Sequence, residues 1–302
     1  MLQHLLEAGL RQTMRRFVRP VLHPAVPVSV QRTLTRQAYR SSIPPRECLF
    51  DREEMAGLPV TRTRVEDANR GNSSGGVVLY LHGGGYIIGS STTHRGLTGH
   101  LAQASGCNVI TPDYRLAPEH PFPAALDDAE AVYCALLKLG TRAEHIAIAG
   151  DSAGGGLTLA LAMRLRDKNL PLPSSLTVFS PWVDLTQQQL YRPECEPVLQ
   201  AQWTGKAARL YSGDEPLTNP LISPIYGDLS GLPPLLIQAG SEEILLNDAE
   251  RLAAVAQRDD VPTTLEIFNS LWHVFQVHSG QLNRATEAVA DAGAHIRRHL
   301  AA

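Results

Sequence analysis

A serine between two glycines is the first candidate for chemistry in this sequence. Residues 150–154 read Gly-Asp-Ser-Ala-Gly, which places Ser152 at the centre of a G-x-S-x-G pattern. The apolar run His145–Ala149 precedes this motif and a helical stretch, 154–168, follows it, which is the strand-to-helix setting of a nucleophilic serine. The glycines permit a cramped turn, and free N–H groups at a helix start favour developing negative charge. We therefore expect Ser152 to be a nucleophile.

A glycine-rich loop follows another apolar run. Val77–Leu81 leads directly into the tetrapeptide His-Gly-Gly-Gly at 82–85. Backbone N–H groups of such a loop can converge on one point and bind the oxyanion that forms during acyl transfer. We expect Gly83 and Gly84 to donate to this oxyanion. Ala153, the residue after the candidate nucleophile, is expected to be the third donor.

A serine hydroxyl at its ordinary pKa also needs a base. The chain has 11 histidines, so position along the chain has to select among them. The elbow motif is typical of proteins in which the order is serine, acid, histidine, with the histidine after the last strand. His273 follows the last strand-like run, Thr264–Phe268, and is the expected base. His278 lies slightly further along the chain and is the alternative.

A carboxylate is expected to orient that imidazole and to stabilise its protonated form. Glu242, Glu243 and Asp248 all follow the apolar run Leu235–Ala239. We favour Glu243 because a helix and a strand fit between it and His273. Glu242 could face solvent, and Asp248 suits the first turn of the next helix, where the helix dipole favours a carboxylate. Both remain alternatives.

The elements that would position these residues alternate along most of the chain. The expected strands are Val60–Glu66, Val77–Leu81, Asn108–Pro112, His145–Ala149, Leu176–Phe179, Leu235–Ala239 and Thr264–Phe268. The expected helices lie near 93–105, 123–139, 154–168, 247–258 and 282–300. This alternation predicts an α/β fold with a mostly parallel central sheet flanked by helices.

Two segments depart from the alternation. Residues 1–55 begin with an amphipathic helix and continue as a proline-interrupted stretch, and residues 183–225 are rich in Gln, Pro and Tyr. We predict an N-terminal cap segment at 1–55, a helical cap insertion at 183–225, and a core formed by 56–182 and 226–302. The arginine-rich N-terminal helix could lie on a membrane, but packing against the body of the protein is favoured.

Composition restricts the function further. The 302 residues carry a net charge of −3, which argues against nucleic acid as the main partner. No run of about 18 apolar residues occurs, so no transmembrane segment is expected. The four cysteines are far apart, without a CxxC pair or zinc spacing, which favours reduced thiols and a cytoplasmic location. We expect no metal and no cofactor.

Several motifs occur in one order: those at 82–85 and 150–154, the run Asp113–Ala125, Ser-Pro-Trp at 180–182, and Trp272–His273. On these motifs the chain resembles the bacterial branch of the hormone-sensitive-lipase family of α/β-hydrolase esterases, over about residues 75–300, and is similar to a subgroup of acetyl hydrolases. The resemblance implies an α/β-hydrolase fold with a helical cap. It also implies the roles given above to Ser152, His273, Gly83, Gly84 and Ala153. The family usually has aspartate where Glu243 stands.

Two further expectations concern the walls of the site. The prolines of Asp113–Ala125 should fix a rigid loop, in which Arg115 and Glu119 could form an internal ion pair. Trp203 and Tyr211, with the N-terminal Leu/Met stripe, are expected to line or cover an acyl pocket.

The sequence therefore predicts a carboxylesterase that hydrolyses small-molecule esters with short- to medium-chain acyl groups through an acyl-enzyme. An amidase or N-acetyl hydrolase with the same triad is the alternative. A non-catalytic ligand receptor on this scaffold is disfavoured because His273 is present. A homodimer is left open.

Overall fold

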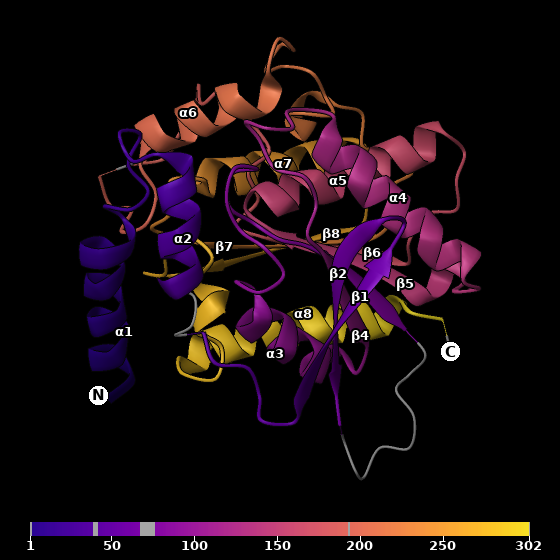
Figure 1. Ribbon diagram of the computed structural model, residues 1–302, viewed down its shortest axis with the longest axis horizontal. Coiled ribbons are helices and arrows are strands. Elements are labelled where there is room, and N and C mark those ends of the chain that lie inside the picture. The colour runs from indigo at the N-terminus through magenta and orange to yellow at the C-terminus, as the bar shows by residue number, and fades with distance from the viewer. Residues whose placement is uncertain (1, 39–41, 67–75, 193, 302) are drawn as a thin grey trace.

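An eight-stranded sheet forms the centre of the computed structural model, which describes residues 2–38, 42–66, 76–192 and 194–301 (Figure 1). Its strands are β1 (Cys48–Met55), β2 (Leu58–Val65), β3 (Val77–Leu81), β4 (Asn108–Pro112), β5 (Ile146–Asp151), β6 (Ser175–Phe179), β7 (Leu235–Gly240) and β8 (Thr263–Phe268). Their order across the sheet is β1-β2-β4-β3-β5-β6-β7-β8. The six strands β4, β3, β5, β6, β7 and β8 are parallel to one another, whereas β2 runs antiparallel to both β1 and β4.

Helices cover both faces of the sheet. They are α1 (Leu2–Thr13), α2 (Val28–Ala38), α3 (Arg95–Ser105), α4 (Ala124–Lys138), α5 (Ala153–Asp167), α6 (Ala201–Ser212), α7 (Leu246–Arg258) and α8 (Asn283–His299). Shorter turns are η1 (Met14–Val18, a π-helix), η3 (Ala143–His145), η4 (Pro224–Tyr226) and η5 (Phe275–His278). The arrangement confirms the predicted mostly parallel sheet with flanking helices.

Strand alternation divides the core between the two faces. Val78 and Tyr80 of β3 pack in one apolar cluster with side chains of α3 and α8. Leu79 and Leu81 point the other way, into the larger cluster that contains side chains of α4, α5 and α7. All five side chains of β3 are buried, as expected for a strand covered on both faces.

The first strand was not predicted, because its sequence lacks the apolar character of a buried strand. β1 lies within the range 1–55 that the sequence analysis assigned to a cap segment, and it forms the edge of the sheet instead. Four consecutive charged residues occupy positions 51–54. Ion pairs from Arg62 to Glu53 and from Arg64 to Asp51 join it to β2. Charged side chains are typical of an edge strand, where they discourage pairing with other chains.

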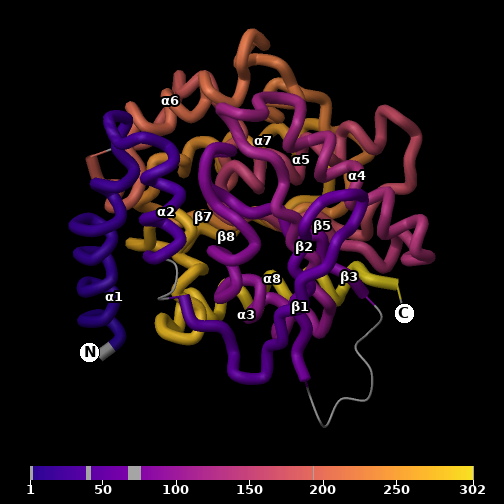
Figure 2. The backbone as a smooth tube through the Cα atoms, viewed as in Figure 1, coloured from indigo at the N-terminus to yellow at the C-terminus, as the bar shows by residue number. Residues whose placement is uncertain are grey.

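The N-terminal segment and the segment between β6 and β7 meet on one side of the molecule, where α1, α2 and α6 lie together (Figure 2). The side-chain amide of Gln200 donates to the backbone oxygens of Arg19 and Leu22, at 2.8 and 2.9 Å. The indole N–H of Trp203 donates to Gln31 Oε1 at 2.9 Å. These contacts join the two segments into one cover. Within the described residues, no helix has the length and apolar character needed to cross a membrane.

Candidate active site

Ser152 lies on a strained turn between β5 and α5. Its φ of +52° and ψ of −121° lie outside the regions that most residues adopt. A Cβ atom on Gly150 would lie 2.3 Å from the backbone oxygen of Gly154, and one on Gly154 would lie 1.9 Å from that of Leu81. Only glycine therefore fits on either side of this elbow, as the G-x-S-x-G pattern predicted.

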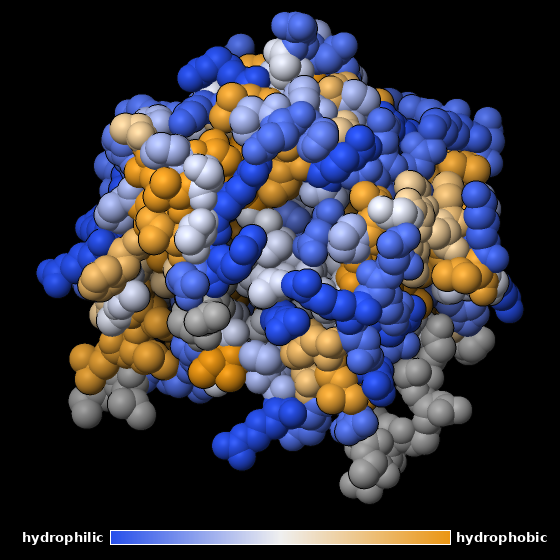
Figure 3. Space-filling model, in the orientation of Figure 1, coloured by the Kyte–Doolittle hydropathy of each residue, from blue (hydrophilic) through white to orange (hydrophobic). Residues whose placement is uncertain are grey.

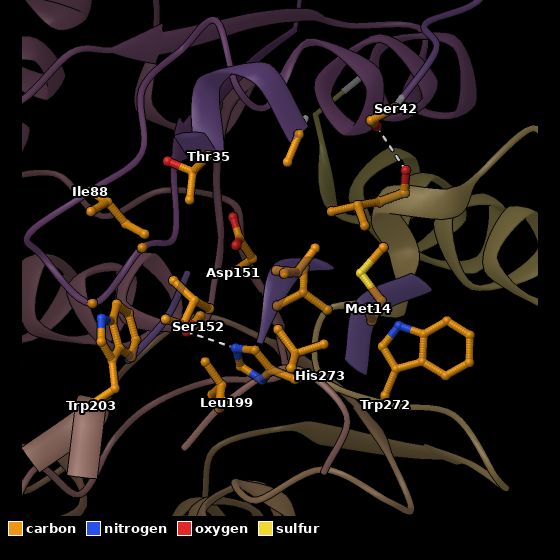
Figure 4. A pocket seen from close by; sticks show the side chains of 18 of the residues that line it. Met14, Thr35, Ser42, Ile88, Asp151, Ser152, Leu199, Trp203, Trp272 and His273 are labelled. Atoms are coloured by element: carbon orange, nitrogen blue, oxygen red, sulfur yellow. Dashed lines mark hydrogen bonds between the residues drawn. The ribbon is translucent and has the colours of Figure 1, made fainter. Parts of the chain in front are cut away.

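The imidazole of His273 faces this serine. His273 Nε2 lies 2.9 Å from Ser152 Oγ, which is hydrogen-bonding distance (Figure 4). The histidine follows β8, on a loop that the fully buried side chain of Trp272 anchors in the core. His278, the alternative base, packs edge-on against Trp272 with ring centroids 5.7 Å apart. The structure thus brings together the serine and the histidine that the sequence analysis favoured.

Of the three candidate carboxylates, Glu243 is the one beside this histidine. Glu243 Oε2 lies 3.8 Å from His273 Nδ1, somewhat longer than a hydrogen bond. The same oxygen accepts a hydrogen bond from Ser180 Oγ at 2.5 Å. Glu243 is fully buried. Within the described residues, neither His273 Nδ1 nor Glu243 Oε1 has a hydrogen-bond partner. A small rotation of the carboxylate would therefore complete the pair.

The other two carboxylates have different partners. Glu242 forms an ion pair with Arg11 of α1. Asp248 is buried and accepts the backbone N–H groups of Val183 and Asp184, at 3.0 and 2.9 Å. Burial raises the pKa of Asp248 to about 7. Both residues fix the surrounding loops and do not contact the imidazole.

A further buried carboxylate, Glu196, lies beside the acid loop and was not predicted. Its two oxygens accept the N–H groups of Val198, at 2.7 Å, and of Ile244, at 3.0 Å. Burial raises the pKa of Glu196 to about 6. No sequence signal marks it, because it lies in a segment without periodicity and reaches Glu243 only through the fold.

Three carboxylates set the charge state of the candidate base. Burial lowers the pKa of His273, but interactions with Glu243, Glu196 and Asp151 outweigh burial, so that this pKa is raised above its ordinary value. An imidazole in this environment accepts a proton readily and is stabilised as imidazolium.

The glycine loop differs from the sequence-based expectation in one respect. The Gly83 N–H, an expected oxyanion donor, donates instead to Asp151 Oδ1 at 2.9 Å. Gly84 and Gly85 line the pocket beside Ser152, and their φ values of +119° and +60° favour glycine. Within the described residues, no hydrogen bond involves the N–H of Gly84 or Gly85. Sequence alone could not show which amide of the run turns toward the serine.

A buried polar network holds Asp151 in place. Its carboxylate also accepts a hydrogen bond from Tyr80 at 2.7 Å and lies 3.3 Å from His94 Nε2. Burial would raise the pKa of Asp151, but His94, Tyr80 and Gly83 lower it further than burial raises it. Burial likewise lowers the pKa of His94, and Asp151 more than compensates. Both shifts favour the charged forms of the two residues, and His94 is part of the support of the site.

The ion pair expected between Arg115 and Glu119 does not form, which corrects that prediction. Arg115 pairs with Asp128 of α4 through Nε and Nη2, at 2.7 to 3.0 Å. Glu119 pairs with Arg32 of α2 through both carboxylate oxygens. Bidentate geometry favours these partners over a neighbour on the same loop. The loop is thus fastened to the core and to the N-terminal segment.

The space above Ser152 is a mainly apolar pocket (Figure 4). Its walls include Met14, Val18 and Leu22 from the N-terminal segment and Val198, Leu199 and Trp203 from the segment between β6 and β7. Trp203 lines the pocket as expected. Tyr211 packs on Tyr86 instead, with ring centroids 3.6 Å apart. An uncharged group bound here would be held against the serine and largely shielded from water.

Comparison with known proteins shows the family to which this chain belongs. A family model described as alpha/beta hydrolase fold matches residues 78–277. The chain is 39% identical to an acetyl-hydrolase of Streptomyces hygroscopicus over 269 residues, which cover 84% of this chain and 90% of that protein. It is 35% identical to an esterase of Acinetobacter venetianus over 242 residues, 79% of this chain and 80% of that one.

Solved structures agree over nearly the whole chain. A crystal structure of a hormone-sensitive lipase from a metagenome library has a TM-score of 0.91 at 36% identity, and the match covers 100% of this chain and 99% of that one. A crystal structure of an esterase from the bacterial hormone-sensitive lipase family has a TM-score of 0.89 at 35% identity, and the match covers 97% of this chain and 99% of that one.

Proposed function

We propose that this chain is a carboxylesterase with Ser152, His273 and Glu243 as its triad. The chain belongs to the α/β-hydrolase family and to its bacterial hormone-sensitive-lipase branch of carboxylic ester hydrolases. The observation that carries the proposal is the 2.9 Å contact between His273 Nε2 and Ser152 Oγ at the base of an apolar pocket. A neutral imidazole at this distance can remove the hydroxyl proton as the oxygen attacks.

In the first half of the reaction, Ser152 Oγ attacks the ester carbonyl and His273 takes the proton. Glu243, 3.8 Å from the ring, stabilises the imidazolium that forms. The imidazolium then gives its proton to the alkoxide leaving group, and the ester C–O bond breaks. In the second half, His273 removes a proton from water as the water oxygen attacks the acyl-enzyme carbonyl. The bond between the acyl carbon and Ser152 Oγ then breaks, the acid leaves, and the imidazolium returns the proton to Ser152.

We assign the oxyanion donors as the N–H groups of Gly84, Gly85 and Ala153. Gly84 and Gly85 line the pocket next to the serine, while the Gly83 amide is engaged by Asp151. Ala153 is the first residue of α5, where backbone N–H groups lack acceptors in the helix. Donors of this kind are worth about 3 kcal/mol each to acyl transfer.

The pocket supports uncharged esters with short- to medium-chain acyl groups. Its lining is mostly apolar, with few polar groups apart from those of the site, so that a charged acyl group would lose its hydration without compensation. The name acetyl-hydrolase carried by one relative is consistent with the short end of this range.

The test is hydrolysis of p-nitrophenyl esters of increasing acyl length by the wild type and by Ser152→Ala. We expect turnover with short and medium chains, and a loss of on the order of 10⁴-fold or more in Ser152→Ala. Ser230→Ala, at an exposed position, is the matched control and should keep full activity. Comparable activity of the Ser152→Ala variant would refute the proposal.

The matching anilides separate esterase from amidase activity. Cleavage of an amide needs protonation of a poorer leaving group, so we expect esters to be cleaved much faster than anilides of the same acid. Faster cleavage of the anilides would favour the amidase alternative. A fluorophosphonate that fails to label Ser152 would favour a non-catalytic receptor.

A further inference from the structure

Positive charge is concentrated in the N-terminal segment. Residues 1–45 contain seven arginines and one acidic residue, Glu7. The whole chain has 27 basic and 30 acidic residues, so the remainder has 20 basic against 29 acidic. A segment of net charge +6 therefore covers a body of net charge −9. Part of this charge is neutralised by the ion pairs of Arg11 with Glu242 and of Arg32 with Glu119. The remaining positive charge favours a negatively charged partner.

Exposed apolar side chains are concentrated in the same segment. Of the eight large hydrophobic side chains that are exposed within the described residues, five belong to it: Leu5, Phe17, Val30, Leu34 and Ile43. Phe17 is 70% exposed and Leu5 is 65% exposed. Figure 3 shows apolar surface gathered over the side of the molecule that carries α1 and α2, with polar side chains between. Clustered exposed apolar groups mark an interaction site more often than scattered ones.

The turn η1 connects this surface with the pocket. Met14 and Val18 point inward and line the pocket above the serine. Arg15, Arg16 and Phe17, between them, are exposed. Within the described residues neither arginine forms an ion pair, and the contact of Arg15 with the Glu194 oxygen is long, at 3.5 Å. The outer side of η1 therefore offers two cations and an aromatic ring to solvent directly over the pocket.

We propose that this surface, formed by Leu5, Arg15, Arg16, Phe17, Val30 and Leu34 and here called the N-terminal face, docks on an anionic lipid surface. Apolar side chains of this kind insert at the boundary between headgroups and acyl chains, and arginines beside them meet the lipid phosphates. Each basic residue near such a surface adds about 1 kcal/mol, or roughly fivefold in partition. A basic, partly apolar face on an acidic body also orients the molecule, because the rest of the surface is repelled.

The experiment is flotation of the full-length protein with phosphatidylcholine vesicles and with vesicles of phosphatidylcholine and phosphatidylglycerol in equal parts. We expect binding to the anionic vesicles at low salt, little binding to the neutral ones, and release as salt is raised. The double variant Arg15→Glu/Arg16→Glu should weaken binding to anionic vesicles by more than tenfold. Phe17→Ser should weaken it by roughly tenfold, because an inserted ring is lost.

Matched controls lie elsewhere on the surface. Leu139→Ser removes another exposed apolar side chain, and Arg297→Glu/Arg298→Glu reverses two exposed charges at the end of α8. Both should bind as the wild type does, and circular dichroism spectra should show that all variants are folded. Ser152→Ala should also bind normally, which separates lipid binding from hydrolysis. Absent binding to anionic vesicles, equal binding to neutral ones, or equal loss in the control variants would overturn the proposal.

Discussion

The carboxylate of Asp151 accepts the backbone N–H of Gly83 at 2.9 Å and so joins the nucleophile elbow to the glycine loop. Asp151 is the last residue of β5 and Gly83 follows β3 closely, and these two strands are parallel neighbours in which Leu81 of β3 is the register partner of Gly150 on β5. The carboxyl ends of these strands meet at one edge of the sheet. The contact fixes how far Ser152 lies from the amides beyond Gly83.

We predict that Asp151→Asn destabilises the protein as well as the site. The substitution removes the charge that faces His94 in a buried ion pair, and breaking such a pair costs about 3 kcal/mol of unfolding free energy. Urea unfolding and ester hydrolysis at the same pH measure the two effects. Tyr80→Phe removes only one hydrogen bond to the same carboxylate, and should cost about 1 kcal/mol. Wild-type stability in Asp151→Asn would show that the network contributes nothing.

A second prediction concerns the oxyanion donors. A boronic acid bound covalently to Ser152 mimics the tetrahedral intermediate, so one of its oxygens should occupy the oxyanion position. We expect this oxygen to accept the N–H groups of Gly84, Gly85 and Ala153, at about 2.7 to 3.1 Å. The Gly83 N–H should stay on Asp151. A crystal structure of the adduct measures these distances, and an oxygen bonded to Gly83 would contradict the assignment.

The parts of the site that the sequence could predict are those with local patterns. Ser152 is marked by flanking glycines that the elbow requires, and the backbone contacts at Gly150 and Gly154 explain why. His273 follows from the order of strands, because the loop after β8 returns to the same edge of the sheet as the elbow. Such features depend on neighbours in the chain.

The parts that could not be predicted depend on contacts between distant segments. Glu196 carries no local signal and reaches the acid loop only through its bond to Ile244. Arg115 and Glu119 are close in sequence, but their better partners lie on α4 and α2. The hydrogen bond from the Gly83 N–H could not be predicted, because it depends on how the Asp151 side chain is oriented in the fold.

The pH dependence of hydrolysis tests the base and its acid. Because His273 acts as the neutral imidazole and its pKa is raised above 6.5, kcat/KM should rise with pH through an apparent pKa above that value. Glu243→Gln removes the nearest negative charge, so the pKa of His273 should fall and the acidic limb should move to lower pH. The plateau rate should fall by roughly 10³- to 10⁴-fold.

Glu242→Gln is the matched control for this profile. Its carboxylate pairs with Arg11 on the cap side of the same loop, so the limb should stay in place and the rate should change far less. An acidic limb that moves in Glu242→Gln, but not in Glu243→Gln, would transfer the role of the acid to Glu242.

The last prediction concerns Glu196 and stability. Its folded pKa of about 6 lies above the ordinary value of 4.5, so the native state holds the proton more tightly than the unfolded chain does. The resulting stabilisation is present below 4.5 and is lost as pH rises through 6. The difference amounts to about 2 kcal/mol. Glu196→Gln cannot ionise, so its unfolding free energy should gain about that much relative to the wild type over this range.

Urea unfolding at a series of pH values measures this gain. Glutamine offers one acceptor oxygen where the carboxylate bonds two amides, Val198 and Ile244, so the variant should be less stable than the wild type at low pH. The informative quantity is how the difference in unfolding free energy between the variant and the wild type changes with pH. Glu54→Gln, at an exposed position on β1, is the control for the effect of replacing a glutamate by glutamine. Parallel curves for the wild type and Glu196→Gln would mean that Glu196 is ionised in the native state as easily as in the unfolded chain.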